Sequence, residues 1–175
     1  MKEMIRYGLV LALICMVASG LLAAVNHFTQ PRIIALAQSQ EEATLLELLP
    51  MSSSFTAIKS KDEVLYYKGY DKNKQLAGVV FKASAKGYSS VIETMVGLTR
   101  DGKITAIKII SQNETPGLGN RVAEPDFISQ FRAKDITGLN QVQAITGATI
   151  SSKAVINSVT QKAKDMQELL KNEPR

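Results

Sequence analysis

The sequence predicts an α+β domain joined to a single N-terminal transmembrane helix. Three patterns predict this class. Residues 7–25 form an uncharged apolar run, residues from about 55 to 111 alternate apolar with polar side chains, and residues from 151 onward repeat apolar side chains every three or four positions. Strands followed by helices are typical of α+β domains. A chain of 175 residues has room for about one such domain and one additional element.

The apolar run at residues 7–25 is long enough to cross a bilayer. At about 1.5 Å per residue it spans roughly 28 Å, close to the thickness of the hydrocarbon core. Lys2 and Arg6 precede it, which favours a cytoplasmic N-terminus and places the rest of the chain outside the cytoplasm, on the cell membrane. A cleaved signal peptide is the alternative, because residues 18–20 are small. Signal-peptide apolar cores, however, usually run about 7–15 residues.

We expect three segments along the chain. Residues 1–30 form the cytoplasmic N-terminus and the anchor, residues 31–50 a juxtamembrane helix, and residues 51–175 the extracytoplasmic domain. The second segment is rich in helix formers and ends at Pro50, which cannot continue a helix.

Alternating apolar residues predict an antiparallel meander from about residue 55 to 111. The Asp101-Gly102 pair separates two of the runs and indicates a hairpin, because Gly readily adopts positive φ. The alternating positions are Val64 and Tyr66, then Ala77 to Ala83, Ile92 to Leu98, and Ile104 to Ile109.

Helices are predicted in the C-terminal third. Thr115-Pro116 predicts a helix start, with Thr as the cap and Pro at the first helical position. A second helix is expected after Pro125-Asp126, with Phe127 and Phe131 on one face. The last helix is expected from Ser151 or Ser152, packed on the sheet through Val155, Val159, Ala163, Met166 and Leu170.

Composition excludes several kinds of site. Cys15 and His27 are the one cysteine and the one histidine of the chain, so the rest of it lacks the ligands of haem, iron–sulfur, zinc and copper sites, and also a Cys–His or Ser–His–Asp nucleophile. Any redox chemistry therefore requires an organic cofactor. The net charge of +5 comes from scattered basic residues and Trp is absent, so nucleic-acid binding is not expected.

Two segments are richer in Gly, Thr and Pro than an ordinary loop. In residues 114–119 (ETPGLG), Gly117 and Gly119 let the backbone approach a ligand closely, although a capped helix start is the simpler interpretation. In residues 146–152 (TGATISS), the hydroxyls offer either helix caps or a point of covalent attachment. A phosphate on Thr149 would lie beside the positive end of the following helix.

These segments, together with Gly87-Tyr88 and residues 92–98 (IETMVGL), carry a family resemblance. The chain resembles the G subunits of Rnf-type ion-translocating ferredoxin:NAD oxidoreductases, and more distantly the C subunits of sodium-translocating NADH:quinone oxidoreductases. Both belong to the FMN-binding domain family, and the resemblance covers essentially the whole chain. It implies an electron-carrying subunit of a translocase, with no independent catalytic site and no metal site.

The resemblance implies a covalent FMN, joined through its phosphate to Thr149 by a separate flavin transferase that uses FAD. The family's transferase motif usually has Asp where this chain has Gln143, a departure that bears on recognition by the transferase. We expect the two Gly- and Thr-rich segments to converge on one pocket. The implied flavin-site residues are Glu114, Thr115, Gly117, Leu118, Gly119, Thr146, Gly147, Ala148, Ser151 and Ser152.

Two side chains near the implied flavin site, those of Tyr88 and Lys153, each allow two interpretations. Tyr88 is expected in the core, with packing near the flavin as the alternative. Lys153 either neutralises the phosphate or is an ordinary solvated helix residue.

The implied partners are the membrane, the flavin transferase, and other subunits of an Rnf-type complex that bear flavins and iron–sulfur clusters. The C-type subunit of the quinone-reducing relative is an alternative, although the chain is short for it. A pilin-like protein is another, but the acidic residue expected shortly after Gly8 is absent. A third is an anchored binding domain without a redox role.

Overall fold

The computed structural model describes residues 2–60 and 63–171. Residues 1, 61–62 and 172–175 lie outside the described structure. They include the first residue of the predicted anchor segment, two residues of the predicted meander and the last four residues of the predicted domain. The chain divides into two compact units, residues 1–43 and 44–175, which are considered separately.

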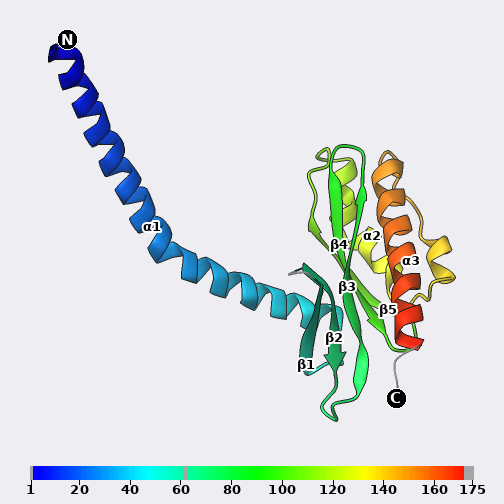
Figure 1. Ribbon diagram of the computed structural model, residues 1–175. Coiled ribbons are helices and arrows are strands. Elements are labelled where there is room, and N and C mark those ends of the chain that lie inside the picture. Colours follow the sequence, from blue (N-terminus) through cyan, green and yellow to red (C-terminus); the bar gives the residue numbers. More distant parts are fainter. Residues whose placement is uncertain (1, 61–62, 172–175) are drawn as a thin grey trace. The chain divides into compact units, whose positions relative to one another are not determined.

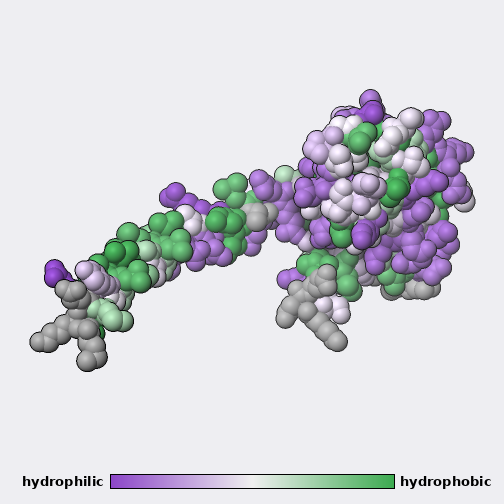
Figure 2. Space-filling model, turned by 90° about the horizontal axis from the view of Figure 1, so that it is seen from above, coloured by the Kyte–Doolittle hydropathy of each residue, from purple (hydrophilic) through white to green (hydrophobic). Residues whose placement is uncertain are grey.

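Helix α1 (Lys2–Leu48) makes up the whole described part of the first unit and continues into the second. Its 47 residues correspond to roughly 70 Å of helix, well beyond a hydrocarbon core of about 30 Å. By length and composition, Met4–Leu48 is a candidate membrane span. Figure 2 shows mainly apolar side chains along the N-terminal part of the helix and a mixture of polar and apolar ones toward its C-terminal end.

The predicted juxtamembrane helix is not a separate element, because α1 runs through it without a break. Pro31 lies inside α1. Its ring removes one backbone hydrogen bond and clashes with the carbonyl four residues earlier, which bends a helix without ending it. Figure 1 shows α1 changing direction in this part. The helix does end at Leu48, just before Pro50, as the sequence predicts.

The second unit is built on a five-stranded antiparallel sheet with the strand order β1-β2-β3-β4-β5, shown in Figure 1. This confirms the predicted meander. The turn between β4 and β5 contains Gly102 at φ +80°, and Thr99 donates its N–H to the carbonyl of Lys103 (2.8 Å). The strands are β1 (Ser54–Ser60), β2 (Glu63–Tyr70), β3 (Leu76–Lys86), β4 (Val91–Thr99) and β5 (Ile104–Ser111).

Helix α3 (Thr149–Lys171) packs on one face of this sheet, mainly against β3 and β4. The two-residue period of the strands points Phe81 and Val96 toward the helix, and both are fully buried. The predicted helix face is confirmed. Its buried apolar residues are Val155, Val159, Ala163, Met166 and Leu170.

Short helices connect β5 to α3: η1 (Gly119–Ala123), α2 (Pro125–Ile128), η2 (Ser129–Phe131) and η3 (Gly138–Gln141). Phe127 and Phe131 are buried with their rings edge to face at 5.4 Å, as the predicted helix face requires. The prediction of a helix that begins at Thr115-Pro116 is wrong. The chain turns there instead, because Gly117 adopts φ +75°, which no right-handed helix accommodates.

The opposite face of the sheet is covered by residues 44–49, which are the end of α1 and the residue that follows it. Leu45, Leu48 and Leu49 are buried against Val80. Thr105 donates its hydroxyl to the carbonyl of Leu48. Residues 44–49 are therefore part of the folded domain.

A glycine permits this close contact. A Cβ on Gly97 of β4 would meet the carbonyl oxygen of Leu48 and the hydroxyl of Thr105. A salt bridge between Lys108 and Glu47 (2.6 Å) adds a polar contact at the surface.

We predict that Leu48→Ala lowers the free energy of unfolding of the domain by about 2–5 kcal/mol, because it leaves a cavity beneath the sheet. Leu46→Ala, two residues away on the same helix, is the matched control, since Leu46 is 47% exposed. Chemical denaturation of the full chain in detergent measures both. Equal losses in the two variants would show that burial of Leu48 does not stabilise the domain.

Candidate functional site

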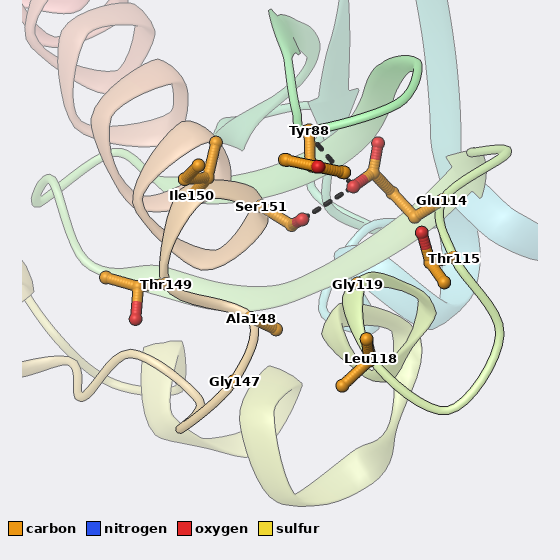
Figure 3. A pocket seen from close by; sticks show the side chains of 10 residues that line it. All are labelled: Tyr88, Glu114, Thr115, Leu118, Gly119, Gly147, Ala148, Thr149, Ile150 and Ser151. Carbon is orange, nitrogen blue, oxygen red and sulfur yellow. Dashed lines mark hydrogen bonds between the residues drawn. The ribbon is translucent and has the colours of Figure 1, made fainter.

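A cavity of about 540 Å³ lies where three segments of the second unit meet. The segments are the tip of the β3–β4 hairpin, the loop after β5, and the first turn of α3 (Figure 3). The lining residues are Tyr88, Glu114, Thr115, Leu118, Gly119, Gly147, Ala148, Thr149, Ile150 and Ser151. Ligand pockets in proteins commonly have volumes of about 300–1,000 Å³.

The Glu114 carboxylate joins these three segments. Its Oε1 accepts hydrogen bonds from the backbone N–H of Ser89 (3.0 Å), the backbone N–H of Ser90 (2.8 Å) and the Ser90 hydroxyl (3.3 Å). Its Oε2 accepts from the backbone N–H of Tyr88 (3.1 Å) and from the hydroxyl of Ser151 (2.6 Å). We call this set of contacts the Glu114 clasp. It ties the hairpin tip and α3 to the loop after β5.

Two glycines make room for the carboxylate. A Cβ on Gly87 would lie 2.7 Å from Oε1 of Glu114, and a Cβ on Gly119 would lie 2.6 Å from Oε2. Such distances are too short for any side chain. Gly87 and Gly119 are therefore needed for the Glu114 clasp to form.

The clasp favours the ionised form of Glu114, whose side chain is buried. Burial by itself raises the pKa of this carboxyl, but hydrogen bonds from Ser151 and from the N–H groups of Ser90, Ser89 and Tyr88 lower it. The pKa falls below its ordinary value as a net result. The site thus holds a buried negative charge at neutral pH.

The start of α3 is shaped by a tight turn and by Ser152. Ala148 donates its N–H to the carbonyl of Ile145 (2.9 Å), and Gly147 stands third in this turn at φ +83°, as a type II turn requires. The buried Ser152 hydroxyl accepts from the N–H of Ile145 (3.1 Å) and donates to the carbonyl of Ala148 (2.9 Å). Ser152 therefore holds the loop on the helix and does not face the cavity.

Thr149 is the first residue of α3, and its side chain is exposed. Figure 3 shows it at the edge of the cavity, on the other side of the first helical turn from the Glu114–Ser151 hydrogen bond. Ala148 precedes it and has no side-chain oxygen with which to cap the free N–H groups of the helix.

The structure brings the two Gly- and Thr-rich segments together, as predicted, but not every predicted residue lines the cavity. Gly117, Thr146 and Ser152 are not among the lining residues. Gly117 and Thr146 are exposed elsewhere on the surface of their loops. The predicted residues that line the cavity are Glu114, Thr115, Leu118, Gly119, Gly147, Ala148, Thr149 and Ser151.

Tyr88 is not a core residue, contrary to the expectation from sequence. Its side chain is 69% exposed and lines the cavity, because it lies at the tip of the β3–β4 hairpin and outside the sheet. Ile150 also lines the cavity and is 57% exposed. Sequence reasoning missed it, although a large apolar residue on the polar start of a helix is a detectable signal.

We predict that Glu114→Gln destabilises the domain at pH 7 by about 1–3 kcal/mol, because the amide presents N–H groups to buried donors. The folded-state pKa of Glu114 is lowered, so its contribution to stability is complete above the ordinary pKa of about 4.3 and is lost as pH falls through the folded-state value. The difference between wild type and variant should therefore shrink below about pH 4.

Urea unfolding at pH 7, 5 and 3.5 measures this difference. Glu168→Gln, the same change at an exposed position of α3, is the matched control. A difference that stays constant over this pH range would contradict the prediction.

Family models match both parts of the chain. Residues 87–164 match the FMN-binding domain, and residues 1–48 match the RnfG N-terminal region. The fold is similar to that of two solved structures. These are NqrC of Shewanella oneidensis (TM-score 0.53, 21% identity, covering 70% of this chain and 73% of that one) and the C subunit of the Na(+)-translocating NADH-quinone reductase of Parabacteroides distasonis (TM-score 0.51, 18% identity, covering 78% and 85%).

Several relatives align over most of their length. The G subunit of the proton-translocating ferredoxin:NAD(+) oxidoreductase complex of Clostridium ljungdahlii is 36% identical over 85% of this chain and 84% of its own. The G subunit of the Na(+)-translocating complex of Acetobacterium woodii is 32% identical over 97% and 95%. The G subunit of the ion-translocating oxidoreductase complex of Methanosarcina acetivorans is 31% identical over 90% and 92%. The chain therefore belongs to the family of G subunits of Rnf-type ion-translocating oxidoreductase complexes.

Proposed function

We propose that this chain is the membrane-anchored electron-transfer subunit of an Rnf-type ion-translocating ferredoxin:NAD+ oxidoreductase, and that it carries FMN on Thr149 through a phosphoester bond. The family assignment supports an FMN and an electron-transfer role. The attachment point is argued from the distribution of hydroxyl groups around the cavity.

One observation carries the choice of Thr149. Within residues 146–152, Ser151 and Ser152 are buried, and their hydroxyls are engaged by Glu114 and by the loop backbone. Thr146 is exposed but does not line the cavity. Thr149 is both exposed and at the cavity. The Thr149 hydroxyl is therefore the one in this segment that a transferase can reach. A group attached to it would lie beside the pocket.

The start of α3 suits a phosphate at this position. The first N–H groups of a helix have no intrahelical acceptor, and the helix dipole favours an anion there. The Ala148 side chain is a methyl group, so it does not compete with a phosphate for these N–H donors. Lys153 is exposed and lies four residues after Thr149, on the same face of the helix. Its ammonium is placed to neutralise a phosphate on Thr149.

The other walls of the cavity suit the flat, largely apolar ring of a flavin. Tyr88, Leu118 and Ile150 line it with large side chains that are at least half exposed. The bound flavin would supply the electron-accepting and electron-donating chemistry. The protein's own residues fix its position and shield part of the ring. No described lining residue needs to act as an acid or a base.

The assembly and location follow from the same proposal. The named relatives are subunits of multi-subunit complexes, so the partners are other Rnf-type subunits that bear flavins and iron–sulfur clusters. Helix α1 supplies the anchor, with its basic start in the cytoplasm and the FMN domain outside. Maturation requires a flavin transferase in the same compartment as Thr149.

We predict that Thr149→Val abolishes covalent flavin, because Val keeps the shape of Thr but has no hydroxyl to esterify. Thr56→Val, the same substitution at an exposed threonine of β1 outside this segment, is the control and should retain full labelling. In-gel flavin fluorescence and intact mass of the full chain, produced with a flavin transferase, measure both. Wild-type protein without a mass increase under these conditions would remove the main support for the proposal.

We also predict that Gln143→Asp increases the rate of flavin attachment several-fold when transferase is limiting. The Gln143 side chain is exposed, while its backbone N–H donates to Oε1 of Gln130 (2.8 Å), so the substitution leaves that hydrogen bond in place. A time course of fluorescence incorporation tests this. Equal rates would show that the transferase tolerates Gln at this position.

A further inference from the structure

We propose that Glu114 is a fixed negative charge at the wall of the flavin pocket, and that this charge lowers the reduction potential of the flavin. The proposal rests on the proposed attachment of FMN to Thr149. It gives Glu114 a role distinct from holding the cofactor: both of its oxygens are occupied by donors of the protein itself.

The position of the charge is set by the fold. Glu114 lines the cavity while its side chain is only 5% exposed. The hairpin tip on one side and Ser151 of α3 on the other restrain it, so the carboxylate cannot swing out into solvent. Gly87 and Gly119 close in around it.

The carboxylate accepts a hydrogen bond from each of its partners in the clasp, and this favours its charged form. Five donors from four residues point at its two oxygens, and three of these donors are backbone N–H groups that cannot accept a proton in return. A neutral carboxylic acid would have to direct its own O–H at one of them. The lowered pKa of Glu114 agrees with this geometry.

No cation balances this charge within the lining of the cavity. Among its ten described residues, Glu114 is the sole carboxylate, and none is Lys or Arg. Lys153 follows Thr149 by about one helical turn on the same face, and Figure 3 shows Thr149 on the side of the helix away from Glu114. Neighbouring N–H dipoles reduce the field of the carboxylate, but its full unit of charge remains.

Reduction of a flavin adds electron density to its ring. A fixed negative charge nearby repels that density, and the repulsion is stronger in a partly buried site than in water because the effective dielectric constant is lower. The oxidised form is favoured relative to the reduced form, so the midpoint potential falls. Removal of the charge should move the potential in the opposite direction.

The test uses the full chain with covalent FMN, in detergent, and measures midpoint potentials by spectroelectrochemical titration. Glu114→Gln removes the charge at nearly constant shape, whereas Glu114→Asp keeps the charge and disturbs the contacts. We expect an upward shift in Glu114→Gln and a clearly smaller one in Glu114→Asp. An unchanged potential in Glu114→Gln, or equal upward shifts in both variants, would overturn the proposal.

A second pair tests electrostatic control of the flavin from this wall if Glu114→Gln does not fold. Thr115 also lines the cavity and is exposed, so Thr115→Lys and Thr115→Met place long side chains that differ by one charge beside the carboxylate. Thr115→Lys should have the higher midpoint potential, because its ammonium offsets Glu114. Equal potentials in this pair would refute electrostatic control of the flavin from this wall.

Failure of this inference is distinguishable from failure of the proposed function. Wild-type protein that carries no flavin on Thr149, judged by intact mass, contradicts the proposed function. Wild-type protein that carries the flavin, with variants whose potentials do not follow the charge, contradicts the role of Glu114 alone.

Discussion

The burial of the Glu114 carboxylate is the constraint on which the site depends. A buried charge is tolerated only when it is fully hydrogen-bonded, and here the donors come from a hairpin tip and from the first turn of α3. These segments are far apart in the sequence, so satisfying one carboxylate fixes their positions together. Gly87 and Gly119 leave the room that the carboxylate needs, because a Cβ at either position would overlap its oxygens.

The sheet positions the clasp by packing on both of its faces. Helix α3 is held on β3 and β4 by its apolar face, and this places its N-terminus beside the end of β5 and the tip of the β3–β4 hairpin. Residues 44–49 cover the other face. The sheet is therefore covered on both faces within the domain. The cavity lies where the elements end, beside the first N–H groups of α3, which have no intrahelical acceptor.

Local patterns predict the elements well, because the strands and α3 each bury one face and so show a clear period in sequence. Contacts between distant residues are not predictable in this way. Nothing in the pattern of residues 88–90 indicates that their N–H groups meet Glu114. The sequence and the family resemblance therefore make the carboxylate a flavin contact and Tyr88 a core residue. The turn at Thr115 is not predictable from the local pattern either. Pro116 favours a helix start, but Gly117 adopts a positive φ, which prevents a helix.

The different roles of the hydroxyl groups within residues 146–152 follow from the same geometry. Ser151 and Ser152 are buried, and their hydroxyls donate hydrogen bonds to Glu114 and to the carbonyl of Ala148. Thr149, in contrast, points outward at the edge of the pocket. A phosphate near Glu114 would meet like charge, while one on Thr149 would lie on the far side of the helical turn, one turn before Lys153. A covalent tether at that position, as proposed, would let a negatively charged cofactor share a pocket with a buried carboxylate, because a covalent bond withstands a repulsion that would weaken a dissociable complex.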